Sequence, residues 1–231
     1  MKESPDERER QIAQLEAYVS EGKRAKMAEV LARRTGHLRV ILEDVYQPHN
    51  ASAVMRSCDC FGVQHLHVTE NHNAYRVNPD VAMGSQKWIT LHRHRDPPGR
   101  ATEACFAELR SAGFRIVATA LRPESVPLGE LDLTQPIALC FGTERDGLSE
   151  AALKAADAWV HLPMYGFTQS FNVSVCAALC LHDMRQRLDT LPLDIALCPN
   201  EQREIYLAWL KKSVHAADAI LAELARRNRP E

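Results

Sequence analysis

The sequence predicts an α/β fold with a mostly parallel sheet, flanked by helices near both ends of the chain. In the middle of the chain, short apolar runs of strand length alternate with stretches of helical periodicity, a pattern typical of parallel α/β sheets. Near both ends, the apolar residues instead recur at helical spacing. With 231 residues and a hydrophobic content of 45%, the chain is long and apolar enough for one sizeable core.

Charge and hydropathy exclude two classes of protein. No apolar run approaches the roughly 18 residues that a membrane-spanning helix needs. The first ten residues, MKESPDERER, are too charged for a secretory signal. We therefore expect a cytoplasmic protein without a membrane partner. The formal net charge of −2 gives no overall bias toward a polyanion, so such a partner would have to be recognised by a local cluster of charge.

The cysteine and histidine patterns favour neither a disulfide framework nor a metal site. The seven cysteines are an odd number, and most lie in apolar periodic segments, as buried free thiols of a reducing compartment do. Two pairs of histidines, His65/His67 and His92/His94, alternate as strand residues would. Zinc remains an alternative, but no spacing of four ligands appears, so we expect no metal.

The N-terminal segment predicts two helices within residues 5–33, broken near residues 20–22. Several cations gather in its second half, opposed only by Glu21 and Glu29. A solvated helix face is one interpretation of this cluster, and a phosphate-binding arm is the other. The residues themselves leave both interpretations open.

The central segment predicts six strands and three main helices. The expected strands are 38–42, 64–68, 88–91, 114–119, 137–141 and 159–162, and the expected helices are about 51–61, 102–112 and 173–188. Asn50 is a good helix N-cap, and Pro48 argues against an earlier start of the first helix. Residues 69–86 are polar and predict a long loop.

The C-terminal segment predicts a linker followed by one long helix. Pro192 and Pro199 mark the linker, and apolar residues recur at helical spacing through residues 201–227. We therefore expect three parts: a helical basic arm at 1–36, a central domain at 37–190 and a helical extension at 191–231.

Two loops in the central segment predict a ligand site. Residues 142–147 and 163–172 each follow an apolar run and precede a helical pattern, which places both at the carboxyl ends of neighbouring strands. A phosphate-binding P-loop would need Lys-Ser or Lys-Thr after Gly147, where Leu148-Ser149 stands, and no G-x-G-x-x-G turn is present. The loops therefore leave the ligand open.

Five polar residues stand at the expected strand-to-helix junctions: Asn50, Arg56, Glu144, Ser170 and Asn172. Ser170 or Asn172 alone would be explained as a helix cap. Convergence of all five on one edge of a sheet is harder to explain by capping, and it favours a functional site.

Three blocks of sequence resemble those of one family. They are HNASAVMRSCDCFGV, which holds Asn50 and Arg56, then FGTERDGLSE, and then LPMYGFTQSFNVSVCAA. In this order they are similar to the blocks of the SpoU branch of the SPOUT RNA 2′-O-methyltransferases, and the likeness spans about residues 38–190. Phe171 stands where this family usually has Leu, a change that could reshape the cofactor pocket.

The resemblance implies a deep trefoil knot near the C-terminal end of the sheet domain. It also implies a homodimer whose active site is built at the subunit interface. In this family the knot binds S-adenosylmethionine (SAM), largely through backbone atoms. By position, the cofactor-binding residues would be Thr119, Ala120, Leu121, Phe141, Gly142, Thr143, Glu144, Leu162, Met164, Ser170, Phe171 and Asn172.

The implied reaction is methyl transfer from SAM to a ribose 2′-hydroxyl. Arg56 is the residue expected to activate the hydroxyl, although a guanidinium is a poor base and favours electrostatic stabilisation instead. Asn50 would hold Arg56 or the ribose. Glu144, Ser170 and Asn172 would position the loops, SAM and the target nucleotide.

Some segments point to a group within this family. VYQPHN, ATALR and the pair Arg185/Arg187 resemble members that methylate guanosine 18 in the D-loop of tRNA. The expected RNA-binding residues are Lys23, Lys26, Arg33, Arg34, His49, Arg185 and Arg187. A relative that acts on ribosomal RNA or at another tRNA position would share all three blocks, and a non-catalytic RNA-binding protein is a further alternative.

Overall fold

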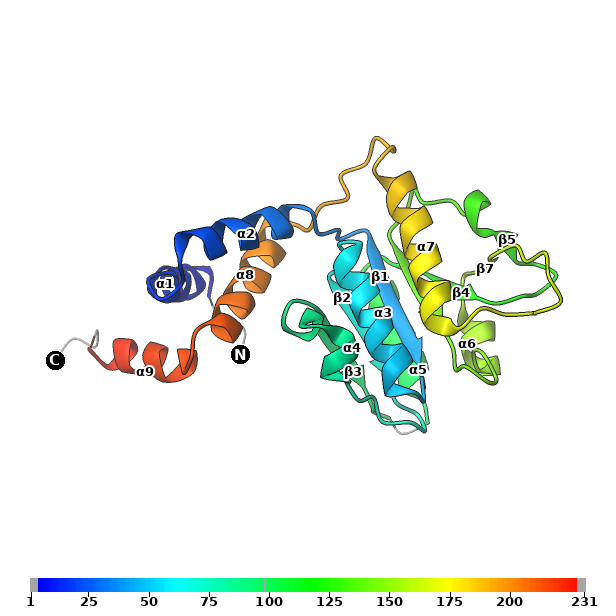
Figure 1. The fold of residues 1–231 in the computed structure, drawn as a ribbon, viewed down its shortest axis with the longest axis horizontal. Helices are drawn as coiled ribbons and strands as arrows, with labels where there is room; N and C mark the ends of the chain where they lie inside the picture. The colour runs from blue at the N-terminus through cyan, green and yellow to red at the C-terminus, as the bar shows by residue number, and fades with distance from the viewer. Residues whose placement is uncertain (1–3, 98, 228–231) are drawn as a thin grey trace. The chain divides into compact units, whose positions relative to one another are not determined.

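The computed structural model describes residues 4–97 and 99–227, and it divides the chain into two compact units (Figure 1). The larger unit comprises residues 35–195. The smaller unit joins the N-terminal segment up to Arg34 with the C-terminal segment from Ala196. Periodicity carries no information about which distant helices pack together, so the sequence does not reveal this pairing of the terminal segments.

The larger unit is built on one sheet of seven strands in the order β3-β2-β1-β6-β4-β7-β5, and each recorded pair is parallel. The strands are β1 Leu38–Glu43, β2 His65–Thr69, β3 Thr90–His94, β4 Arg115–Thr119, β5 Val126–Pro127, β6 Ile137–Phe141 and β7 Ala158–His161. The predicted parallel α/β class is confirmed. All carboxyl ends of the strands therefore meet at one edge of the sheet, where a ligand site is expected.

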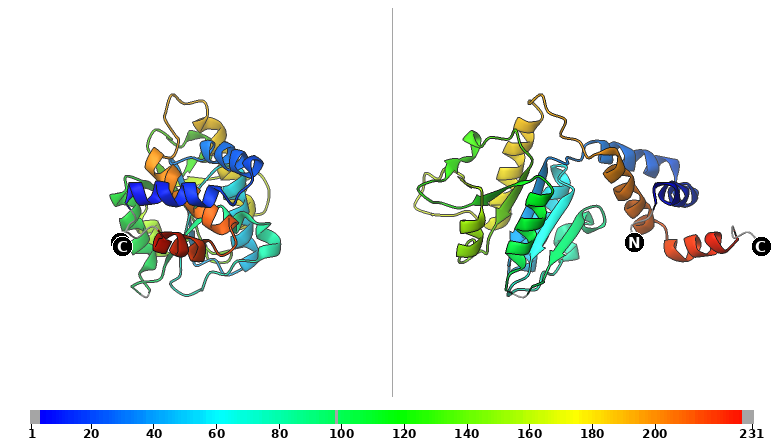
Figure 2. Two further views of the ribbon diagram at one scale, coloured as in Figure 1. Left: turned by 90° about the vertical axis from the view of Figure 1, so that its left-hand side faces the viewer. Right: turned by 180° about the vertical axis from the view of Figure 1, so that it is seen from behind.

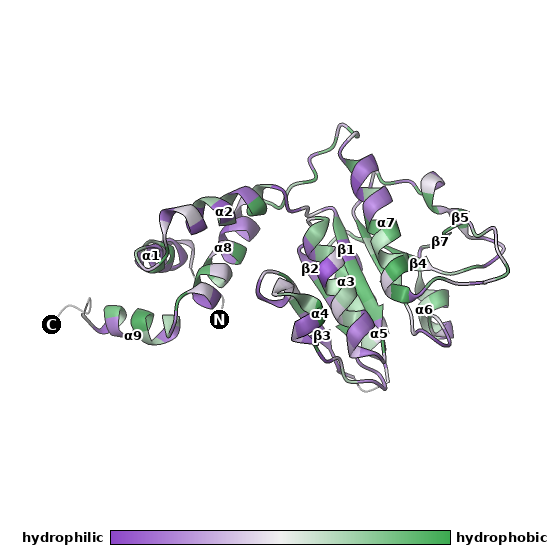
Figure 3. Cartoon of the chain, viewed as in Figure 1, coloured by the Kyte–Doolittle hydropathy of each residue, from purple (hydrophilic) through white to green (hydrophobic). Residues whose placement is uncertain are grey.

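Helices cover both faces of this sheet (Figure 2). Helices α3 (Pro48–Cys60) and α7 (Val173–Leu188) share a core with Val40 and Leu42 of β1. Helices α5 (Ala101–Ser111) and α6 (Glu150–Ala155) share the opposite core with Ile41. Successive residues of β1 thus face opposite cores, as the two-residue period of a strand requires. Figure 3 shows the strands as the hydrophobic centre between helices of mixed character.

The sequence misplaced several boundaries in this unit. Helix α3 begins at Pro48, because proline suits the first helical position, where its missing N–H would have no partner. Asn50 therefore lies within the first turn and does not cap the helix. Strand β3 begins two residues later than predicted, at Thr90. The predicted loop 69–86 also holds a short helix, α4 (Pro79–Ala82), and the start of a 3₁₀ turn, η1 (Ser85–Lys87). A second 3₁₀ turn, η2 (Leu128–Glu130), follows β5.

The smaller unit is helical. Its helices are α1 Pro5–Glu16, α2 Glu21–Ala32, α8 Pro199–Ser213 and α9 Ala217–Arg227. The prediction of one helix over residues 201–227 is wrong, because Val214 is extended and Ala216 is left-handed, with φ of 56°. The buried guanidinium of Arg8 joins α1 to α8 by donating to Asn200 Oδ1 (2.6 Å) and Glu204 Oε1 (2.9 Å). In the described part of the chain, no helix is both long and apolar enough to span a membrane.

Candidate functional site

Three of the predicted site residues meet in one hydrogen-bonded network. Asn50 Nδ2 donates to Glu144 Oε1 (2.8 Å) and to Gln47 Oε1 (3.1 Å). Asn172 Nδ2 in turn donates to Asn50 Oδ1 (3.1 Å). These side chains come from the first turn of α3, the loop after β6 and the start of α7, so the network ties together the three sequence blocks.

Asn172 has two structural functions at once. Its Oδ1 accepts from the Ser174 amide (2.9 Å) and from Ser174 Oγ (2.6 Å), which caps α7. Its Nδ2 reaches Asn50. Asn172 therefore both caps α7 and joins the network with Asn50, while its part in a functional site stays a prediction. The start of α7 is held in a fixed position against α3 as a result.

The loop that carries Glu144 is a tight turn. Thr143 and Gly147 form an antiparallel bridge, with Thr143 N donating to Gly147 O (2.9 Å). Gly147 has a left-handed φ of 71°, which favours glycine. A Cβ at Gly142 would lie 2.1 Å from the Gly147 carbonyl carbon, so a side chain there would collide with the backbone. Both glycines are needed for the turn that presents Glu144.

Glu43 is a further residue of this region, and the sequence did not reveal it. Its side chain holds the segment just after the turn by hydrogen bonds to Ser149. The buried carboxylate accepts from Ser149 N (2.7 Å), Ser149 Oγ (2.8 Å) and Thr102 Oγ1 (2.8 Å). Ser149 also caps α6. A carboxylate at the end of an otherwise apolar strand was the available signal, because a buried charge has to be hydrogen-bonded.

An open pocket of about 700 Å³, a volume that includes its solvent-facing mouth, lies at the carboxyl ends of β4, β6 and β7. Most of the predicted cofactor-binding residues line it: Thr119, Ala120, Leu121, Phe141, Gly142, Thr143, Leu162, Met164, Ser170 and Phe171. Glu144 and Asn172 stand outside this lining, in the network with Asn50.

The chemistry of the lining suits an amphipathic ligand that carries a positive charge. No Lys or Arg is among the described residues that line it. Leu121 and Phe171 are exposed to solvent in its wall, at 65% and 43%. The hydrogen bond with Cys176 and burial raise the pKa of the Cys180 thiol, and the same hydrogen bond lowers the pKa of Cys176. These features fit SAM, whose sulfonium is cationic and whose remaining parts are both apolar and polar.

Arg56 lies apart from this network. Its side chain is exposed on α3 and borders a second hollow, which Ser174, Val175 and Leu179 of α7 also line. Asn50 uses its hydrogen bonds on Gln47, Glu144 and Asn172, and no described contact joins it to Arg56. The expectation that Asn50 holds Arg56 therefore does not describe this structure. The predicted Ser170 lines the first pocket, next to the network.

The predicted RNA-binding cations divide into two groups. Lys23, Lys26, Arg33 and His49 are exposed. Lys26 and Arg33 both pair with Glu29, at 3.0 and 3.2 Å, and surface pairs of this kind contribute little stability. These residues are accessible to a polyanion.

The remaining cations of the set have structural partners. Arg34 is only 2% exposed, and its guanidinium lies 5.6 Å from the centre of the Trp209 ring. Arg187 donates to the carbonyl oxygens of Leu128 (2.8 Å) and Leu131, and Arg185 pairs with Asp189 at 2.9 Å. The burial of Arg34 argues against the prediction that it contacts RNA, and the contacts of Arg187 give that side chain a structural role of its own.

Comparison with known proteins agrees with this geometry. Residues 37–182 match the model of the SpoU rRNA Methylase family. A tRNA (guanosine(18)-2′-O)-methyltransferase of Borreliella burgdorferi is 37% identical over 89% of this chain and 92% of its own. The crystal structure of the TrmH/SpoU tRNA modifying enzyme of A. aeolicus superposes with a TM-score of 0.74 at 32% identity, covering 84% of this chain and 98% of that one.

A further solved structure contains the methyl donor. The AdoMet-bound rRNA methyltransferase of Sinorhizobium meliloti superposes with a TM-score of 0.57 at 25% identity, covering 68% of this chain and 58% of that one. The family match includes the Asn50–Glu144–Asn172 network and most of the pocket lining. With three ordered sequence blocks, a shared fold and a match over most of the sheet domain, this chain belongs to the SpoU methylase family.

Proposed function

We propose that this protein transfers a methyl group from SAM to the ribose 2′-hydroxyl of guanosine 18 in the D-loop of tRNA. One observation carries the proposal: the network of Asn50, Glu144 and Asn172 lies beside a pocket whose lining suits SAM. The relatives named for this activity support the substrate, since the likeness to the Borreliella protein runs over 89% of the chain. Action in the cytoplasm, where tRNA is abundant, is part of the proposal.

SAM would be held by the two loops at the carboxyl ends of β6 and β7. Thr119, Leu162 and Phe171 would surround it, and Gly142 would let the backbone approach it closely. When bound, SAM supplies an activated methyl group on a cationic sulfur. The AdoMet-bound relative supports this assignment. We include the deep trefoil knot of the family in the proposal, formed by the segments that carry these loops.

Arg56 is proposed as the group that stabilises the reacting hydroxyl. A ribose hydroxyl is a weak nucleophile near neutral pH, and a nearby guanidinium favours the negative charge that develops on its oxygen. The same side chain would grip the adjacent phosphate. The network of Asn50, Glu144 and Asn172 would hold α3, which carries Arg56, in a fixed position within its own subunit.

A homodimer would bring Arg56 of one subunit to the SAM pocket of the other. Val175 and Leu179 of α7 are 46% and 43% exposed, and with Arg56 of α3 they border one hollow. Apolar side chains grouped on a surface in this way are typical of a protein interface. We propose that a second copy covers this surface, so that Arg56 faces the pocket of the partner subunit.

The experiment is methylation of a tRNA transcript in vitro with methyl-labelled SAM. Label should enter the transcript with guanosine at position 18 and should be lost when another nucleotide stands there. Arg56→Ala should lower turnover by about 100- to 1,000-fold while SAM binding, followed by calorimetry, persists. Equal labelling of both transcripts would contradict the proposed position, and label only in a ribosomal RNA fragment would assign the enzyme to that substrate.

A further inference from the structure

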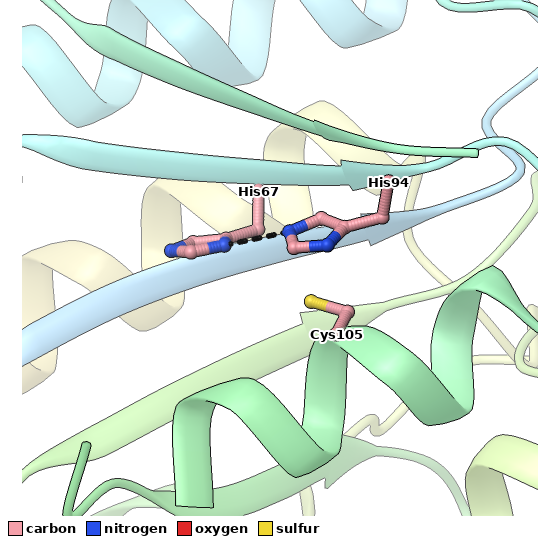
Figure 4. A group of neighbouring side chains, drawn as sticks. All are labelled: His67, His94 and Cys105. Atoms are coloured by element: carbon pink, nitrogen blue, oxygen red, sulfur yellow. Dashed lines mark hydrogen bonds between the residues drawn. The ribbon is translucent and has the colours of Figure 1, made fainter. Parts of the chain in front are cut away.

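A cluster of three potential metal ligands lies away from the proposed active site (Figure 4). His67 comes from β2, His94 from β3 and Cys105 from α5, and one donor atom of each lies within 4.8 Å of the others. We propose that His67, His94 and Cys105 form a site for a single divalent transition metal ion of borderline softness, for which Zn²⁺ is the natural occupant. The sequence alone predicts no metal here, because the three ligands are far apart along the chain.

The donors suit this class of ion. Imidazole nitrogen and thiolate sulfur are the usual ligands of Zn²⁺, at bond lengths of about 2.0–2.3 Å, so ligand atoms in a tetrahedral site lie about 3.3–3.8 Å apart. The facing nitrogens, His67 Nδ1 and His94 Nε2, are 3.1 Å apart. Figure 4 shows the sulfur of Cys105 directed toward these two rings. Small side-chain rotations would bring all three donors to tetrahedral spacing.

The surroundings of the rings are those of a metal site. His94 Nδ1 lies 3.9 Å from a carboxylate oxygen of Glu108, which leaves Nε2 on the side of His67. A carboxylate behind a ligating histidine is a common feature of zinc sites, because it fixes the ring and strengthens the ligand. The ring of His67 is stacked on His92, with centroids 4.3 Å apart. Its Nδ1 forms a hydrogen bond with His94 Nε2 (3.1 Å), a contact that a bound metal ion would replace with two metal–nitrogen bonds.

The buried thiol of Cys105 would bind the ion as a thiolate, the form of cysteine that ligates metals. Binding would form one Zn–S bond and release one proton to solvent. The nearby cation of Arg39 opposes the ion, and the thiolate formed on binding offsets that repulsion.

The proposed metal site would have a structural role. It would link β2, β3 and α5 at one edge of the sheet, whereas the SAM pocket is formed at β4, β6 and β7. His94 is only partly buried, which gives a metal ion a path to the cluster and leaves room for water as a fourth ligand. The proposal does not depend on the proposed methyl transfer.

The test uses the full-length protein, stripped by a chelator and titrated with Co²⁺. A thiolate-to-cobalt charge-transfer band should saturate at one equivalent, Zn²⁺ should displace it, and bound Zn²⁺ should raise the melting temperature by several degrees. Cys105→Ala should abolish the band, and His94→Ala should weaken binding at least about tenfold. Cys58→Ala is the matched control, since it removes an equally buried thiol from the opposite core.

Two outcomes would overturn the site. One is a wild-type protein that binds neither Co²⁺ nor Zn²⁺ at one equivalent. The other is Cys105→Ala or His94→Ala binding as tightly as the wild type. Circular dichroism of each variant distinguishes loss of binding from loss of the fold, and His94, the partly exposed ligand, gives the variant that disturbs the core least.

Discussion

At the scale of single residues, the side chain of Asn50 holds the proposed active site together. It is 4% exposed, and its amide nitrogen serves both Gln47 and Glu144 while its oxygen accepts from Asn172. An amide suits this position because one end donates and the other accepts. A carboxylate at this position could accept from Asn172 but could not donate to Gln47 or Glu144. The sequence predicted that Asn50 belongs to the site, but it expected the residue to cap a helix and to hold Arg56 or the ribose, because partners across 94 or 122 residues of chain cannot be read from local spacing.

We predict that Asn50→Asp destabilises the protein by about 1–3 kcal/mol, because it removes a donor and sets a second carboxylate against Glu144. Glu144→Gln in the same chain should restore much of the loss, since the new amide can donate to the aspartate. Urea unfolding of both single variants and the double variant measures this as a coupling energy. Additive losses in the double variant would show that the two side chains are not coupled.

At the scale of secondary-structure elements, ion pairs between side chains fix the segment after β2 to β3 and the residue that follows it. The side-chain carboxylate of Glu70 accepts from Arg93 and Arg95, each at 2.6 Å, and from the Tyr75 amide at 2.7 Å. Glu70 and Tyr75 lie within the region predicted as a loop. The parallel class of the sheet was predictable from the alternation of strand and helix patterns, whereas the start of β3 and the break between α8 and α9 were not. Both depend on tertiary contacts that outweigh local propensity.

Glu70 makes stability depend on pH. Burial opposes its ionisation, but the hydrogen bonds from Arg93, Arg95 and the Tyr75 amide lower its pKa to about 2. A carboxyl whose pKa is lower in the folded state stabilises the protein above its unfolded pKa of about 4.3, and this contribution is lost as the pH falls toward 2. Because both arginines are partly exposed, we expect about 1–2 kcal/mol. Glu70→Gln should lower stability at pH 7 by this amount and show a smaller loss on acidification; parallel pH curves for the two proteins would contradict the assignment.

At the scale of the whole molecule, two adjacent arginines of the helical unit have different roles. One is accessible for RNA binding, and the other stabilises the fold. Arg33 is exposed beside Glu29, whereas Arg34 is buried against Trp209. Charge clustering in the sequence identified both residues but could not distinguish them, because burial in this unit depends on α8, more than 160 residues away along the chain. The position of the pocket, in contrast, was predictable from the two loops that follow strands, since parallel strands bring their carboxyl ends to one edge. Its lining residues were predicted from the family resemblance of the three blocks.

This pair gives a prediction for RNA binding. Arg33→Ala should weaken tRNA binding and reduce the slope of log affinity against log salt by about 1, with stability unchanged within about 0.5 kcal/mol. Arg34→Ala should instead destabilise the fold by about 1–3 kcal/mol, through lost packing on Trp209. Salt-dependent binding and urea unfolding of both variants check this division. The arm would not be a phosphate-binding surface if Arg33→Ala left the salt slope as it is in the wild type.

A tRNA that lacks only the 2′-hydroxyl of guanosine 18 gives the sharpest test of the proposed methylation. Two synthetic tRNAs would be compared with methyl-labelled SAM, one with guanosine and one with 2′-deoxyguanosine at position 18. We expect about one methyl group per molecule of the first and none on the second. Equal labelling of the two tRNAs, or no label on either, would contradict the proposed methylation.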